Sequence, residues 1–74
     1  MTLDEIKPGQ KCEVVDTTVG GMLGQRLMDM GLYPGLAVRV VRNAPLEDPI
    51  EVQLDGFYVS LRHSEAKYVE VELR

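Results

Sequence analysis

The sequence predicts a mainly β protein, a small barrel of five short strands with one helix inserted between the first and the second strand. Two observations lead to this prediction. Short segments in which apolar and polar residues alternate recur along the chain, and such alternation is typical of half-buried strands. One intervening segment instead has apolar residues at helical spacing. Closing the sheet is the usual way for so few strands to avoid exposed edges, and this order of elements suits an SH3-like barrel.

The first two predicted strands share one pattern. They lie in "IKPGQKCEVV" (6–15) and "LYPGLAVRVV" (32–41), so the second begins 26 residues after the first, at residue 32 against residue 6. Proline fixes φ at the second position of a turn, and glycine accepts the positive φ that a type II turn needs next. We therefore expect the same turn before both strands. The alignment sets Cys12 against Val38, which predicts an apolar core position for Cys12.

The inserted helix is predicted within "GGMLGQRLMDMG" (20–31). Leu23, Leu27 and Met30 fall at i, i+4 and i+7, which places them on one helical face. Gly31 suits the left-handed residue at which many helices end. The two glycines at the start provide no strong N-cap.

A β-hairpin is predicted over "IEVQL" (50–54) and "FYVSL" (57–61), because Asp-Gly between alternating runs favours a type I′ turn. A two-residue loop pairs Leu54 with Phe57. One face of the hairpin is then apolar and is expected in the core: Ile50, Val52, Leu54, Phe57, Val59 and Leu61. The other face carries Glu51, Gln53, Tyr58 and Ser60.

The remaining segments complete the predicted fold. Two prolines mark 41–49 as a loop. "HSEA" (63–66) can form one helical turn with Ser64 as its N-cap. "YVEVEL" (68–73) is the predicted last strand, with its alternate apolar side chains inward: Val69, Val71 and Leu73.

Composition limits the class of protein. The 74 residues are 45% hydrophobic, which predicts one globular domain over 1–74. Twelve acidic against eight basic residues give a net charge of −4, which argues against nucleic acid as a partner. No apolar run is long enough to span a bilayer. The start, "MTLDEIKPG", is acidic where a signal peptide is basic, so we expect a cytoplasmic protein without direct membrane insertion.

Catalytic, cofactor and metal sites are not expected. His63 is the single histidine, and the chain has no glycine-rich phosphate loop. The single cysteine, Cys12, excludes an internal disulfide and Cys-Cys zinc motifs. The chain also has no tryptophan, and Phe57 is assigned to the core, so it lacks the aromatic groove with which signalling SH3 domains bind proline-rich peptides.

What remains is a set of side chains that the predicted core does not use. Leu32 is expected to cover one end of the barrel, whereas its neighbour Tyr33 aligns with the polar Lys7. Methionine and tyrosine are favoured at interaction surfaces. The candidate partner-binding residues are Met22, Arg26, Asp29, Tyr33, Leu46 and Tyr58.

From about Leu3 to Val71 the sequence resembles the FeoA family of ferrous iron transport accessory proteins. The most specific segments are "RLMDMGLYPG" (26–35), "APLEDPIEV" (44–52) and "VSLRHSEAKYVEV" (59–71). The resemblance implies an SH3-like barrel with a helix after the first strand. It also implies a small, non-enzymatic cytoplasmic partner that regulates FeoB, the membrane transporter whose cytoplasmic part carries a GTPase domain. The family brings no agreed catalytic or metal-binding motif.

Two alternatives stay open at this point. A similar domain forms the C-terminal module of iron-dependent metalloregulators, so the chain could be a detached module of that kind. Because it starts at Met1 with no DNA-binding helices before it, we expect the free-standing form. The other alternative is a direct Fe(II) or Zn(II) carrier that uses His63, Cys12 and carboxylates.

Overall fold

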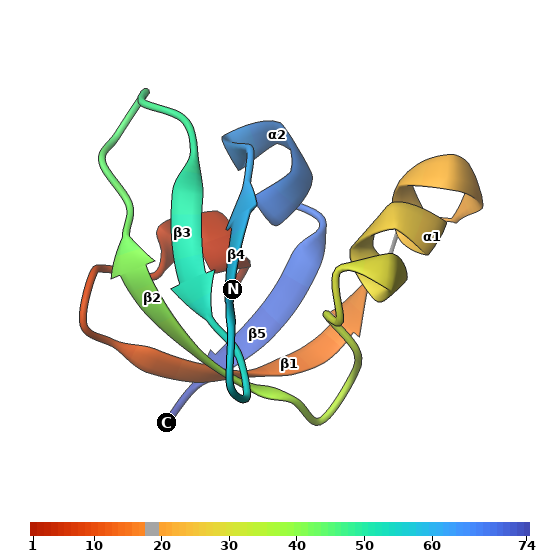
Figure 1. Ribbon diagram of the computed structural model, residues 1–74, viewed down its shortest axis with the longest axis horizontal. Helices are drawn as coiled ribbons and strands as arrows, with labels where there is room; N and C mark the ends of the chain where they lie inside the picture. Colours follow the sequence, from red (N-terminus) through yellow and green to blue (C-terminus); the bar gives the residue numbers. More distant parts are fainter. Residues whose placement is uncertain (18–19) are drawn as a thin grey trace.

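The computed structural model describes residues 1–17 and 20–74, and it confirms five strands with a helix inserted between the first two (Figure 1). A short 3₁₀ helix, η1, precedes the first strand and was not predicted. The elements in chain order are η1 (Leu3–Glu5), β1 (Lys11–Thr17), α1 (Gly21–Asp29), β2 (Ala37–Arg42), β3 (Ile50–Gln53), β4 (Tyr58–Leu61), α2 (His63–Ala66) and β5 (Val69–Leu73).

All five strands belong to one antiparallel sheet in the order β4-β3-β2-β1-β5. The sheet is strongly curved, and α1 stands at one side of it (Figure 1). Among the described residues no ladder joins β4 to β5; the chain passes from one to the other through the single turn of α2. The sheet therefore encloses its core by curvature, with hydrogen bonds along four strand pairs.

The two Pro-Gly segments form the same turn, as predicted. The N–H of Gln10 donates to the carbonyl of Lys7 at 3.1 Å, and the N–H of Leu36 donates to the carbonyl of Tyr33 at 3.1 Å. The third turn residues, Gly9 and Gly35, have φ of 88° and 94°. A positive φ at this position, next to a proline, defines a type II turn.

The two segments also pair with each other. In β1 and β2, Cys12 lies opposite Val38, and both are buried. The N–H of Gly9 donates to the carbonyl of Val40 at 2.7 Å. Its counterpart joins the N–H of Gly35 to the carbonyl of Val14, also at 2.7 Å. The Gly9–Val40 and Gly35–Val14 hydrogen bonds join equivalent positions of the repeated pattern. Each turn is therefore bonded to one of the two opposite ends of the β1–β2 pair.

Among the described residues, sixteen buried apolar residues form the core, and they come from every strand, from the three helices and from the segments between them. Ile6 and Leu32, which occupy equivalent places before the two turns, are both fully buried. Gly31 ends α1 with φ of 94°, as predicted. The buried apolar residues are Leu3, Ile6, Cys12, Val14, Leu27, Leu32, Leu36, Val38, Val40, Ile50, Val52, Leu54, Leu61, Ala66, Val69 and Val71.

The hairpin prediction is right in its register and wrong in two details. The N–H of Leu54 donates to the carbonyl of Phe57 at 2.8 Å, so the loop does contain two residues. Gly56 has positive φ and Asp55 does not, which excludes a type I′ turn. Phe57 is 49% exposed, because its ring lies against Gly31 at the end of the helix, outside the core.

Two predictions near the C-terminus are also wrong. Leu73 is 49% exposed at the end of the edge strand β5, although its cross-strand partner Cys12 is buried. Ser64 is not the N-cap of α2, because the helix begins at His63 and its N-cap is Arg62. Its first amides bond to carboxylates instead: the N–H of His63 donates to Asp48 and the N–H of Arg62 donates to Glu65, both at 2.9 Å.

Candidate partner-binding site

Helix α1 is fixed to the barrel along one face only. Leu27 is fully buried, and Leu23 and Met30 pack against the core with part of their surface exposed. This is the predicted apolar face. The N–H of Leu32 donates to the carbonyl of Leu27 at 3.1 Å, which ties the last turn of the helix to the buried segment after it. The opposite side of the helix remains open to solvent.

An open groove of about 730 Å³ runs along this helix. Three of the predicted partner-binding residues line it together. Met22 is 90% exposed, which is unusual for so large an apolar side chain. Methionine is flexible and polarisable, so it adapts to the surface of a partner. The lining residues are Met22, Leu23, Gln25, Arg26, Asp29 and Met30.

Arg26 joins this helix to α2. Its Nε donates to Oε2 of Glu65 at 2.5 Å, while Oε1 of Glu65 accepts from the N–H of Arg62. The N–H of Arg62, with the hydrogen bond and charge of Arg26, lowers the pKa of the Glu65 carboxyl below its usual value. Arg26 therefore lines the groove, and its ion pair with Glu65 also holds α1 against α2.

We expect Glu65→Gln to lower the free energy of unfolding at pH 7 by about 1 kcal/mol, because it removes a charge-assisted hydrogen bond. The pKa of Glu65 is lowered in the folded state, so its stabilisation is present above the unfolded value of 4.5 and is lost as pH falls through the folded value. Urea unfolding between pH 3 and 7 measures this. The difference from wild type should shrink below about pH 4.5.

Glu70→Gln is the matched control, because Glu70 is exposed on β5. This variant should follow the wild type across the same pH range. A difference for Glu65→Gln that stays constant from pH 7 to pH 3 would show that Arg26 and Glu65 do not form an ionic contact.

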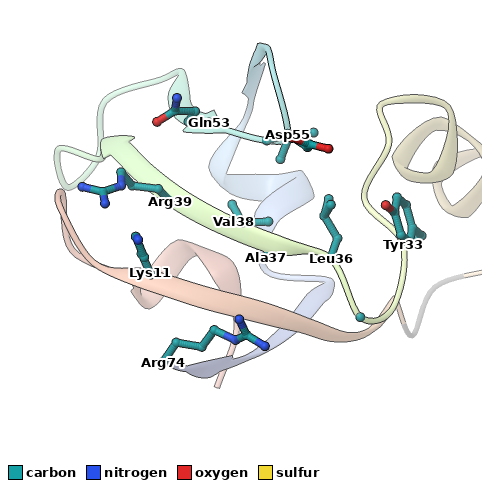
Figure 2. Close-up of a pocket in the computed structure, with 11 residues that line it drawn as sticks. Lys11, Tyr33, Leu36, Ala37, Val38, Arg39, Gln53, Asp55 and Arg74 are labelled. Atoms are coloured by element: carbon teal, nitrogen blue, oxygen red, sulfur yellow. The ribbon is translucent and has the colours of Figure 1, made fainter.

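Tyr33 lies apart from the helix groove, in a second groove of about 550 Å³ over β1 and β2 (Figure 2). About half of its side chain is exposed. This agrees with its alignment to the polar Lys7. The same groove contains Lys11, Arg39 and Arg74, none of which the sequence singled out.

Leu46 and Tyr58 line neither groove. Leu46 is fully exposed in the β2–β3 loop with φ of 62°, and Tyr58 projects from the edge strand β4. The six predicted residues therefore do not form one patch. The structure brings Met22, Arg26 and Asp29 together, places Tyr33 in another groove, and leaves the other two isolated.

The groove residues that the sequence missed fall in two groups. Leu23 and Met30 were assigned to the core, and their partial exposure depends on how closely the helix meets the barrel. Lys11 and Arg39 face outward by strand alternation, but their proximity depends on the β1–β2 register. The Pro-Gly repeat marks the two strands as similar, but it does not specify that they pair with each other.

His63 and Cys12 do not come together with a third ligand. The ring of His63 contacts Oδ1 of Asp48 at 2.8 Å and Oδ1 of Asn43 at 3.0 Å. Burial raises the pKa of the Cys12 thiol to about 11, so the thiol is protonated at neutral pH. Within residues 1–17 and 20–74, no three side chains of histidine, cysteine, aspartate or glutamate are placed to share a metal ion.

No helix in the described part of the chain is long and apolar enough to cross a membrane.

The fold, with α1 packed against the barrel along one face and exposed on the other, defines the class of protein. It is a mainly β, SH3-like domain with a helix inserted after its first strand. The FeoA domain matches residues 1–73. The chain belongs to the FeoA family, whose members are accessory proteins of ferrous iron transport.

Three relatives illustrate the match. An Fe(2+) transport protein A/Fe(2+) transporter FeoB fusion protein from Porphyromonas gingivalis is 36% identical over 73 residues; the alignment covers 99% of this chain and 9% of that protein. A putative Fe(2+) transport protein A from Campylobacter jejuni is also 36% identical, with 99% of each chain covered. The zinc complex of FeoA from Stenotrophomonas maltophilia, described as a procaryotic SH3 domain protein, has a TM-score of 0.81 and 33% identity, covering 97% of this chain and 89% of that one.

Proposed function

We propose that this chain is a cytoplasmic, non-enzymatic binding module that contacts FeoB and regulates its transport of ferrous iron. The observation that carries the proposal is the Porphyromonas gingivalis relative, in which an FeoA part and FeoB are one polypeptide. Covalent fusion raises the effective concentration of two parts that bind each other. A family member that is not fused to FeoB needs affinity for FeoB to reach the same proximity.

The helix groove is the surface that fits this role best. It combines exposed methionine with a charged rim, which is the composition of a protein interface. Its floor consists of side chains that are already partly packed, namely Leu23 and Met30. A partner that fills the groove covers apolar surface without having to open the barrel.

We expect Met22→Asp to weaken binding to FeoB of the same organism, reconstituted in nanodiscs, by about tenfold or more, because it places a charge in an apolar contact. Calorimetry gives the affinity, and the rate of iron uptake into FeoB proteoliposomes gives the regulation. Aspartate in the first turn of a helix is electrostatically favourable, so this variant should fold.

Met28→Asp is the matched control. Met28 is exposed on the same helix but does not line the groove. Its position near the helix C-terminus makes aspartate less favourable there, so any general loss of helix would affect the control more. Equal affinities for the two variants would place the contact elsewhere, and the absence of wild-type binding and of any change in uptake would contradict the proposed function.

A further inference from the structure

Three basic side chains lie next to one another on the outer surface of the sheet. Lys11 of β1 is the direct cross-strand partner of Arg39 of β2. The N–H of Arg74 donates to the carbonyl of Lys11 at 3.0 Å, which continues the β5 pairing by one residue. Lys11, Arg39 and Arg74 therefore form a basic row across three neighbouring strands, about 10 Å from end to end at the usual strand spacing.

The row does not stabilise the isolated domain. Like charges directly opposite each other in a sheet are destabilising. Within the described residues, Lys11 and Arg39 make no ion pair, and only Arg74 is paired, with Glu13. The chain contains twelve acidic residues and carries a net charge of −4, yet three of its eight basic residues are gathered here. The arrangement is complementary in charge to a negatively charged ligand.

The surface around the row is shaped to receive a narrow ligand. Gly35 and Ala37 contribute little side-chain volume, which leaves a groove of about 550 Å³ between the basic row and Tyr33. Figure 2 shows Lys11 and Arg39 at one end of this groove and Tyr33 at the other. Of the described residues that line it, Asp55 is the single acidic one.

We propose that this groove binds an acidic, extended segment of FeoB, with carboxylates on the basic row and an apolar side chain against Tyr33. The inference rests on the proposed function and names the chemistry of the segment that is recognised. Arginine and lysine bind carboxylates through charge-assisted hydrogen bonds. Such contacts add specificity and speed of association even where exposure limits their strength.

Adjacent acidic residues favour a peptide over an anionic membrane. The next outward pair on β1 and β5 is Glu13 opposite Glu72. A broad negative surface that reaches the basic row would also approach these two carboxylates and be repelled. A single peptide strand is narrow enough to contact Lys11 and Arg39, the unpaired end of the row, without lying over the Glu13–Glu72 pair.

The test compares two double variants that lose the same charge. Lys11→Gln with Arg39→Gln removes the unpaired part of the row, while Lys7→Gln with Lys67→Gln removes two exposed lysines outside the groove. Both are titrated against FeoB in nanodiscs of uncharged phosphatidylcholine, at 50 and 300 mM NaCl. Flotation with vesicles of phosphatidylcholine and phosphatidylglycerol measures lipid binding without FeoB.

We expect the row variant to raise Kd at 50 mM NaCl about tenfold and to lose most of the salt dependence, while the control changes Kd less than twofold. The melting temperature of the row variant should equal or exceed that of the wild type, because a repulsion has been removed.

Wild-type binding to FeoB with equal Kd for both variants would overturn this inference and leave the proposed function intact. Row-dependent binding to anionic vesicles but not to FeoB in neutral nanodiscs would assign the row to lipid, and failure of the wild type to bind FeoB would overturn both proposals.

Discussion

Leu32→Ala should lower the free energy of unfolding by about 2–5 kcal/mol, the usual cost of truncating a fully buried leucine. A single core of this size rarely supplies more than about 3–5 kcal/mol in total, so a large share of the variant should be unfolded at room temperature. Leu32 lies between the end of α1 and the turn before β2, so its loss leaves a cavity where helix and barrel meet. Urea unfolding followed by circular dichroism measures the change.

Leu46→Ala makes the same chemical substitution at a fully exposed position. It should change the free energy of unfolding by less than about 0.5 kcal/mol. If the two variants had the same urea midpoint, Leu32 would not be part of the core that joins α1 to the sheet.

Gly35→Ala and Gly9→Ala should each lower the free energy of unfolding by about 1–2 kcal/mol. The two decreases should be similar. Both glycines have φ near +90°, and a methyl group built on either one meets no atom within 4 Å. The cost is therefore backbone strain alone. Equal decreases in the free energy of unfolding are expected because the two turns are hydrogen-bonded in the same way to opposite ends of the β1–β2 pair. Thermal and urea unfolding of the two single variants provide the comparison.

Gly20→Ala is the control for this pair, because Gly20 has φ of −92° and equally open surroundings. It should remain within about 0.5 kcal/mol of the wild type. A large difference between Gly9→Ala and Gly35→Ala would show that the repeated pattern does not correspond to equivalent structural roles.

The Pro-Gly repeat was the most informative feature of the sequence. It predicted two turns of one type and the strands that follow them, because proline and glycine restrict backbone angles locally. It did not predict that the two copies pair with each other. Strand register is decided by contacts between distant residues, and a local pattern cannot specify it.

The errors have a common cause. Strict alternation placed Phe57 and Leu73 in the core, but alternation does not say how far the core extends along a strand. Phe57 lies just before β4, and Leu73 is the last residue of the edge strand β5, where it is exposed although it pairs with Cys12. Ser64 was expected to cap α2, whereas Asp48, from a loop fifteen residues away, accepts a hydrogen bond from the N–H of His63. A cap supplied by tertiary structure leaves no local signal.

The sequence predicted the exposure of the candidate residues but not how they are arranged. Exposed Met22 and Tyr33 could be inferred because the core pattern did not require them. Their separation into two grooves could not, since it depends on where α1 meets the barrel. The basic row was missed for the same reason: its members come from β1, β2 and the residue after β5, which only the folded sheet brings together.

The proposed contact with FeoB is tested most directly by NMR titration of the ¹⁵N-labelled chain with the cytoplasmic part of FeoB, followed by the full-length transporter in nanodiscs. We expect saturable chemical-shift changes at the amides of α1 around Met22 and Arg26 and in the groove at Lys11, Tyr33 and Arg39. The amide of Ser64, an exposed residue of α2 outside both grooves, should show little change in chemical shift. The absence of saturable changes with both forms of FeoB would contradict the account.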